Sequence, residues 1–123
     1  MIHILFTLKG CDRRVLDNKS LVEQSISVAT RVSNSTLLGL NSHKFHPQGV
    51  TCVALLAESH ISVHTWPELG IAVCDVFTCG KETKPMDAAL HLKMAFNAED
   101  IDFNVIDRGN ISDLIEDNLT EEE

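Results

Sequence analysis

Residues 50–79, VTCVALLAESHISVHTWPELGIAVCDVFTC, contain three apolar runs, each with the length of a β-strand. The runs are VTCVALLAE, SHISVHTW and IAVCDVFTC, and the PELG segment between the last two has the composition of a tight turn. Strands joined by such short connections pair in antiparallel fashion. The centre of the fold is therefore predicted to be an antiparallel sheet.

Further elements flank these strands. Strands are predicted in IHILFTLKG, STLLGLNSHKF and IDFNVIDRG, and helices over residues 18–33 and in KPMDAALHLKMAFN, where Pro85 suits the first helical turn. For the first helix, Asp17 or Asn18 is predicted to cap the start, and Ser20 and Glu23 match a capping box. Its main apolar face is predicted to contain Leu21, Ser25, Val28 and Val32, with Val22, Ala29 and Ile26 beside it. The apolar stripe predicted for the second helix is Met86, Ala89, Leu90, Met94 and Ala95. This order predicts an α+β fold, a two-layer αβ sandwich with two helices on one face of a mostly antiparallel sheet.

Length and charge favour one globular domain followed by an acidic tail. The 123 residues have a formal net charge of −8, but six of the acids lie in residues 112–123, which contain no Lys or Arg. The domain is therefore assigned to residues 1–111, and the tail is expected to be disordered. There is no basic stripe for nucleic acid and no apolar run long enough to span a membrane. The start does not resemble a signal peptide, so we expect a cytoplasmic protein with its four cysteines as free thiols.

The AESHISVHTWPELG run carries the candidate chemistry. On a strand, His60, Ser62 and His64 share one face. A zinc site using both histidines with Cys74 and Cys79 is disfavoured, because the histidines would lie roughly 13 Å apart. No metal site is therefore predicted.

Two interpretations remain open from the spacing alone. In the first, the histidines of this run have only a structural role, as is also expected for His3, His43, His46 and His91. In the second, Ser59, a histidine base and Cys79 perform nucleophilic chemistry on adjacent strands. The glycine after Cys79 favours the second interpretation weakly, because it lets a backbone approach a ligand closely.

The AESHISVHTWPELG run followed by DVFTCG resembles the signature of bacterial-type S-adenosylmethionine decarboxylase, a pyruvoyl-dependent family. The likeness continues through CDRRVLDN, HKFHPQGV and HLKMAF, and covers about residues 3–109. It implies an αβ sandwich of antiparallel sheet and helices. It also implies an obligate homodimer with active sites at the interface.

The resemblance implies that the chain cleaves itself between Glu58 and Ser59. The Ser59 hydroxyl would attack the carbonyl of Glu58 and turn the peptide into an ester, and β-elimination would then leave a pyruvoyl group at residue 59. His64 would remove the proton needed for the elimination, a task for which histidine is the commonest side chain, and Thr51 would support processing.

The same resemblance implies the roles of the cofactor and of the acid. The covalent pyruvoyl group would form a Schiff base with the substrate amine and accept the electrons released with carbon dioxide. Cys79 would then return a proton to the α-carbon of the substrate. For the nucleoside, Phe45 would face the adenine, Glu68 would hold the ribose hydroxyls, and Trp66 would complete the binding site. The product would be the aminopropyl donor for spermidine.

Three positions depart from the pattern of the family: Thr7 replaces a carboxylate, Thr51 a serine and Ile71 a tyrosine. Thr51 keeps the hydroxyl group, whereas Thr7 removes a charge. One alternative is therefore a pyruvoyl-dependent decarboxylase of ornithine or arginine on the same scaffold. A second is a non-catalytic homologue, although the presence of Ser59, His64 and Cys79 speaks against it.

Overall fold

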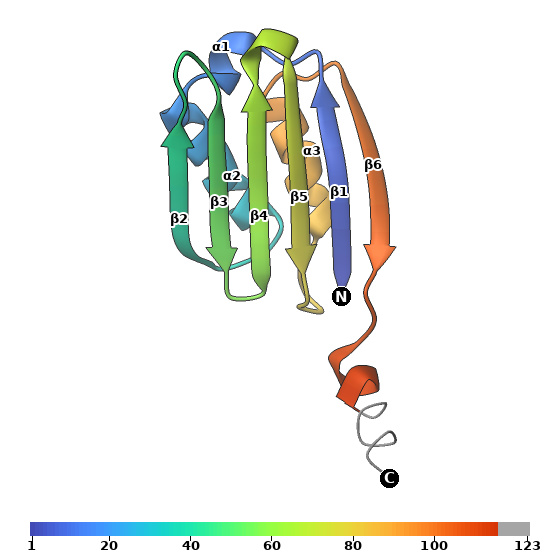
Figure 1. Ribbon diagram of the computed structural model, residues 1–123. Coiled ribbons are helices and arrows are strands. Elements are labelled where there is room, and N and C mark those ends of the chain that lie inside the picture. The colour runs from blue at the N-terminus through green and yellow to red at the C-terminus, as the bar shows by residue number, and fades with distance from the viewer. Residues whose placement is uncertain (116–123) are drawn as a thin grey trace.

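The computed structural model describes residues 1–115, and most of the predicted acidic tail, residues 116–123, lies outside the described residues (Figure 1). The strands are β1 (Ile2–Lys9), β2 (Leu37–Lys44), β3 (Val50–Leu56), β4 (Ser59–Trp66), β5 (Ile71–Thr78) and β6 (Asp100–Asp107). The labelled helices are α1 (Arg13–Leu16), α2 (Lys19–Val32), α3 (Pro85–Ala95) and the short 3-10 helix η1 (Pro67–Leu69). Residues 111–115 are also helical, so the prediction of a disordered tail is wrong for residues 112–115. Every strand of the prediction is confirmed.

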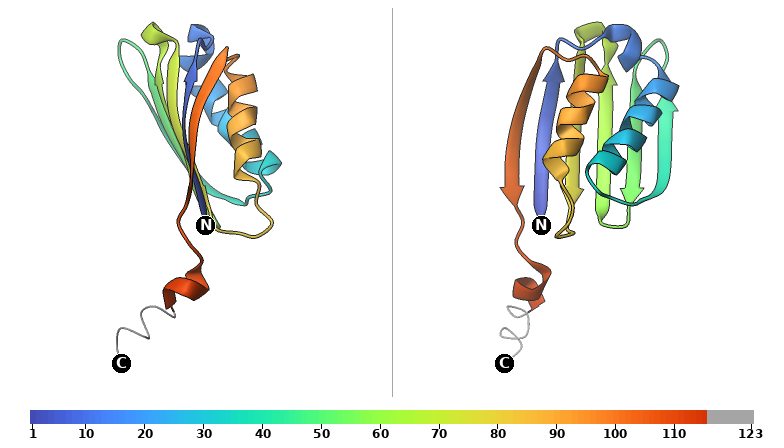
Figure 2. Two further views of the ribbon diagram at one scale, coloured as in Figure 1. Left: turned by 90° about the vertical axis from the view of Figure 1, so that its right-hand side faces the viewer. Right: turned by 180° about the vertical axis from the view of Figure 1, so that it is seen from behind.

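The strands form one six-stranded sheet in the order β2-β3-β4-β5-β1-β6. All neighbouring pairs are antiparallel. Within residues 1–115, helices α2 and α3 cover one face and no helix covers the other, as the edge-on view in Figure 2 shows. The predicted two-layer α+β architecture is therefore confirmed, and we call the uncovered side of the sheet the open face.

The core lies between the sheet and the two helices. Alternate residues of each central strand point into it, such as Ile61 and Val63 of β4, both fully buried. Their neighbours His60, Ser62 and His64 are only partly buried and lie on the open face. Burying a side chain of this size contributes about 1.5–3 kcal/mol, so this alternation fixes which face carries the histidines.

The buried faces of both helices agree with the prediction only in part: Val22, Ile26, Ala29 and Ala89 are buried as predicted. In α2 the buried residues are Val22, Ile26, Ala29 and Thr30, and in α3 they are Ala88, Ala89 and Leu92. The predicted Leu21, Val32, Leu90 and Met94 are exposed. Both helices carry apolar residues on more than one side. The side that packs against the sheet becomes the buried one, and the periodicity of the sequence cannot predict which side that is.

The predicted capping box at the start of α2 is wrong. The alternative prediction of Asn18 as the cap is confirmed, because its side chain accepts a hydrogen bond from the Leu21 amide at 3.1 Å. Glu23 instead accepts a hydrogen bond from the Ser42 hydroxyl on β2. The carboxylate is used to join helix to sheet, a contact that local sequence does not reveal.

Helix α1 was not expected from the sequence. Asp12 caps it, and the Thr65 hydroxyl donates to the carbonyl oxygen of Leu16 at its end, at 2.8 Å. The same Thr65 oxygen accepts a hydrogen bond from the Val50 amide at 2.8 Å. The short helix therefore closes the upper end of the sheet in Figure 1.

Among the described residues, no helix has the length and apolar character that crossing a membrane requires.

Candidate active site

The predicted cleavage position lies in the tight connection between β3 and β4. β3 ends at Leu56, and Ser59 is the first residue of β4, where it pairs with Thr78 of β5. The Glu58 side chain accepts a hydrogen bond from the Thr36 amide at 2.9 Å. These contacts hold the Glu58–Ser59 peptide at the lower edge of the sheet.

Cys79 follows directly after β5 and reaches this peptide. Its thiol donates to the carbonyl oxygen of Glu58, with an Sγ–O distance of 2.7 Å. The neighbouring Gly80 permits the approach, because a Cβ atom there would lie 3.3 Å from Cγ of Glu58 and 3.1 Å from Cγ2 of Thr83. The structure thus brings together three of the predicted residues, Glu58, Ser59 and Cys79.

His64 lies elsewhere on the sheet. It sits on the open face beside Thr51 of β3, and the Thr51 hydroxyl and Nδ1 of His64 are 3.1 Å apart. His64 is five residues further along β4 than Ser59, a separation of about 16 Å on an extended strand. The sequence-based expectation that serine, histidine and thiol would meet on adjacent strands is therefore wrong within a single chain.

The predicted substrate residues gather at the upper end of the sheet. A cavity of ≈ 340 Å³ is lined by Phe45, Gln48, Gly49, Thr51, His64, Thr65, Trp66 and Glu68. Phe45 and Trp66 are 46% and 42% exposed, so their rings are available to a ligand and are not core residues. Glu68 lies on η1 and supplies a carboxylate at the same cavity.

A larger hollow of ≈ 690 Å³ runs along β2 and β3, lined by residues 39–43 with Thr51, Val53 and Leu55. Thr51 alone of the predicted site residues lines it. The smaller cavity is therefore the better candidate for a nucleoside, because it combines exposed aromatic rings with a carboxylate.

Known proteins of one family are similar to this chain. Residues 2–109 match the family model for S-adenosylmethionine decarboxylase. The chain is similar to an S-adenosylmethionine decarboxylase proenzyme of Methanococcus aeolicus, with 45% identity over 89% of this chain and 93% of the relative. A proenzyme of the same name from a Synechococcus strain is 50% identical over 74% of this chain and 71% of the relative. The crystal structure of the adenosylmethionine decarboxylase from Aquifex aeolicus aligns with a TM-score of 0.83 at 38% identity, covering 89% of this chain and 91% of that chain.

The chain belongs to the S-adenosylmethionine decarboxylase family. The resemblance read from its motifs is thereby confirmed. The two positions that depart most from the family pattern lie on or beside the open face: Thr7 is opposite Val73, and Ile71 is opposite Trp66. Neither lines the cavity that contains Phe45 and Glu68.

The open face of this decarboxylase carries exposed apolar side chains on several strands. They are Leu5 of β1, Val53 and Leu55 of β3, and Val73 of β5, with exposed fractions between 40% and 58%. Both groups of candidate site residues border this face, one at each end of β4 (Figure 1). Ser59 and Trp66 are the two ends of that strand, about 23 Å apart.

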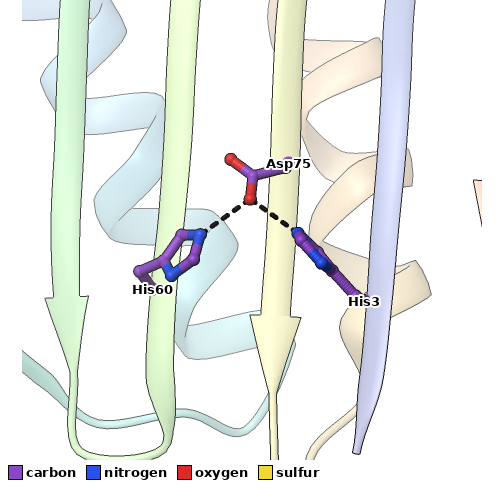
Figure 3. Close-up of side chains that lie close together, drawn as sticks. All are labelled: His3, His60 and Asp75. Carbon is purple, nitrogen blue, oxygen red and sulfur yellow. Dashed lines mark hydrogen bonds and ion pairs between the residues drawn. The ribbon is translucent and has the colours of Figure 1, made fainter. Parts of the chain in front are cut away.

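Sequence reasoning missed one cluster on the open face. Nε2 of His3 and Nε2 of His60 lie 2.8 Å and 2.7 Å from the same carboxylate oxygen of Asp75 (Figure 3). The other oxygen of Asp75 accepts a hydrogen bond from the Ser62 hydroxyl. Burial acts to raise the pKa of Asp75, but the hydrogen bonds from Ser62, His3 and His60 outweigh it, so the pKa lies below its ordinary value. His3 is far from the other residues in sequence, and no spacing could have predicted the group.

The remaining thiols of this decarboxylase are packed in the core. Cys11, Cys52 and Cys74 are buried, whereas Cys79 is exposed. Burial raises the pKa of Cys11 and of Cys52 to about 11. Burial, followed by the nearby Cys11 and Asp75, raises the pKa of Cys74 well above its ordinary value. Cys79 is therefore the thiol that chemistry can use.

Proposed function

We propose that this protein cleaves itself at Glu58–Ser59 and then decarboxylates S-adenosylmethionine to S-adenosyl 3-(methylthio)propylamine, for spermidine synthesis. The observation that carries the proposal is the contact between the Cys79 thiol and the carbonyl oxygen of Glu58. The curated relatives are named proenzymes, and the chain shares their family. Free thiols at all four cysteines suit a cytoplasmic location.

The first step acts on the peptide that Cys79 contacts. The Ser59 hydroxyl attacks the carbonyl carbon of Glu58, and negative charge develops on the oxygen that the thiol already faces. A donor placed where charge develops lowers the barrier. The peptide C–N bond then breaks, the amine of residue 59 is released and takes up a proton, and Glu58 is held as an ester.

The second step needs a base. Removal of the α-proton of residue 59 expels the Glu58 carboxylate, and residue 59 becomes dehydroalanine. Addition of water and loss of ammonia leave the pyruvoyl group at the start of the chain of residues 59–123. His64 is suited to be this base. In the tautomer whose Nδ1 carries the ring proton and donates a hydrogen bond to the Thr51 hydroxyl, Nε2 has a free lone pair that can accept a proton.

His64 of one chain cannot reach Ser59 of the same chain, because they lie about 16 Å apart on an extended strand. We therefore place the complete site between two copies of the chain. Their open faces pack together, so that the Ser59 end of one copy lies against the His64 end of the other. The exposed apolar residues of the open face provide the surface for this contact.

Substrate residues then come from both copies. The pyruvoyl group supplies a ketone that accepts the electrons of the bond broken on decarboxylation. Phe45 provides a ring for the adenine, and Glu68 accepts hydrogen bonds from the ribose and attracts the sulfonium charge. Cys79 returns the proton to the α-carbon, because its exposed thiol lies directly beside the Glu58–Ser59 peptide.

Intact-mass measurement of the purified protein tests the cleavage. Two chains divided between residues 58 and 59 are expected, and Ser59→Ala should remain a single chain. Release of carbon dioxide from S-adenosylmethionine, ornithine and arginine, measured side by side on cleaved protein, tests the substrate. Release from ornithine or arginine alone would overturn the substrate and leave the pyruvoyl mechanism intact.

A further inference from the structure

The His3–His60–Asp75 cluster has no role in the steps described above. Its three side chains come from three neighbouring strands, β1, β4 and β5, and meet on the open face (Figure 3). Their potential ligand atoms all lie within 4.8 Å of one another. We propose that these three residues bind a divalent transition-metal ion, with Zn²⁺ as the best fit.

The register of the sheet aims the three side chains at one point. His3 and His60 both pair with Phe77, one from each side, and Asp75 lies two residues before Phe77 on β5, on the same face. The Phe77 ring packs against both imidazoles, with centroid distances of 5.2 Å and 6.0 Å. The imidazole planes are turned by 83° to each other, so both Nε2 atoms converge on Asp75 from different directions.

The charge of the cluster also suits a cation. The Asp75 side chain is only 19% exposed, and within residues 1–115 its ionic contacts are with His3 and His60 alone. The guanidinium of Arg108 lies over Phe77, 5.2 Å from the ring centroid, and forms no ion pair with Asp75 in that part of the chain. A largely buried carboxylate with no Lys or Arg partner in that part of the chain carries a negative charge that a divalent ion would offset.

The donor set selects the type of ion. Two imidazole nitrogens and a carboxylate oxygen match Zn²⁺ better than Mg²⁺ or Ca²⁺, which prefer oxygen ligands alone. Ligand atoms about 2.0–2.1 Å from a tetrahedral Zn²⁺ lie about 3.3 Å apart. The present Nε2–oxygen distances of 2.7 Å and 2.8 Å widen to this value with small side-chain rotations. Ser62 fixes the carboxylate through its other oxygen, as residues behind metal ligands commonly do.

One consequence rests on the proposed function. If the chain is cut between residues 58 and 59, His3 belongs to the first product, whereas His60 and Asp75 belong to the second. His60 is also the residue that follows the pyruvoyl group. A bound ion would therefore link the two chains directly beside the active site.

Metal binding can be measured without cleavage or activity. The protein is purified without a histidine tag, stripped with a chelator and titrated with Co²⁺, whose visible ligand-field bands report on its ligands. Wild-type protein and uncleaved Ser59→Ala are titrated in parallel. Each is expected to bind one Co²⁺ per chain, without the charge-transfer band of a thiolate ligand, and added Zn²⁺ should displace the Co²⁺ completely.

Variants locate the site. His3→Gln, His60→Gln and Asp75→Asn should each weaken binding by at least about a hundredfold, and Ser62→Ala, which removes only the hydroxyl behind Asp75, by about tenfold. His43→Gln, on the same sheet outside the cluster, is the matched control and should bind as wild type does. Circular dichroism identifies any variant that is unfolded, and Ser62→Ala then carries the test. No ligand-field bands at equimolar Co²⁺, a thiolate band, or equal binding by the cluster variants and the control would each overturn the proposal. Loss of decarboxylation with intact Co²⁺ binding would instead count against the proposed function alone.

Discussion

The Cys79 thiol contacts the carbonyl oxygen of Glu58 in the uncleaved chain. This contact connects the two roles proposed for the thiol, in self-cleavage and in proton return to the substrate. In the precursor the thiol faces the oxygen on which negative charge develops. In the proposed reaction, cleavage would make Glu58 a chain end and remove this acceptor from the thiol. Its proton would then be free for the substrate carbon, so that a single residue beside Gly80 would serve both proposed steps.

Substitution of Cys79 separates the two roles. Cys79→Ala should slow self-cleavage by up to about a hundredfold, since S–H is a weak donor but is the donor aimed at this oxygen. Cys79→Ser should restore much of the cleavage, yet its turnover should stay about a hundredfold or more below wild type, because a hydroxyl is a poor acid. Mass spectrometry over time measures the first effect and carbon dioxide release the second. Wild-type rates for both steps in Cys79→Ala would exclude the residue from the chemistry.

Thiol accessibility gives a second prediction at this scale. At pH 8, a thiol with a pKa of about 11, as burial gives Cys11 and Cys52, is ionised in only about one molecule in a thousand. Iodoacetamide should therefore modify Cys79 first in the native protein, and all four cysteines after denaturation. Peptide mapping identifies the site, and early modification of Cys74 would show that the core opens readily.

The aromatic ring of Phe45 carries a third prediction. Base stacking contributes roughly 1–3 kcal/mol, so Phe45→Ala should raise KM for S-adenosylmethionine by about 5-fold to 150-fold. Phe103→Ala removes another exposed ring, on β6 far from the cavity, and should leave KM unchanged. Equal KM values for the two variants would remove Phe45 from the substrate site.

At the scale of elements, the turn from residue 45 to residue 49 positions one wall of the substrate cavity. Its end is fixed by Asp17, whose carboxylate accepts hydrogen bonds from the Gly49 amide at 2.8 Å and from Nζ of Lys44 at 2.9 Å. The hydrogen bond from Gly49, followed by the one from Lys44, holds the pKa of Asp17 below its ordinary value. Asp17 thus joins the segment before α2 to the turn that carries Phe45.

Asp17→Asn should loosen this turn. We expect a higher KM for S-adenosylmethionine and a small loss of stability, whereas Asp102→Asn, which breaks an exposed pair with Lys9, should change neither. Because the pKa of Asp17 is lowered on folding, its contribution to stability is present above the ordinary carboxyl pKa of 3.8 and disappears as pH falls through the lower folded value. Urea unfolding of the wild type and of Asp17→Asn should therefore give free energies of unfolding that differ at neutral pH and become equal in acid. A difference that grows in acid would contradict this account.

At the scale of the whole molecule, the two halves of the proposed site lie at opposite ends of one sheet. The Glu58–Ser59 peptide and Cys79 are at one end, and His64 with the nucleoside cavity is at the other. A pair of chains related by a two-fold axis and packed through their open faces brings the unlike ends together twice. The proposed packing of two chains would therefore both cover the exposed apolar residues of the open face and complete the site.

Co-expression of two defective chains tests this arrangement. Ser59→Ala cannot cleave, and His64→Ala should cleave poorly by itself for lack of the base. In a mixed dimer, the intact Ser59 of the His64→Ala chain meets the intact His64 of the Ser59→Ala chain. We expect the His64→Ala chain to be cleaved only when it is co-expressed with the Ser59→Ala chain. The masses of its fragments identify the cleaved chain. As a control, the two chains are purified separately, unfolded, mixed and refolded together. An uncleaved His64→Ala chain in verified mixed dimers would place both residues in one chain.

The sequence by itself determined the strands, the sandwich of sheet and helices, and the family. Strands show a period of two and turns have strong residue preferences, so VTCVALLAE, SHISVHTW and IAVCDVFTC could be placed without a structure. The AESHISVHTWPELG and DVFTCG motifs were also sufficient to recognise the family. Helix faces were harder to predict, because α2 and α3 have apolar residues on several sides and only the position of the sheet determines which side is buried.

Only the tertiary structure decided which residues meet. Ser59 and His64 are close in sequence, but an extended strand separates them by about 16 Å, so their proximity along the chain was misleading. His3, His60 and Asp75 are distant in sequence, yet neighbouring strands bring them to one point. The order of strands in the sheet and their register set these distances, and both arise from pairings between remote segments that no local pattern encodes.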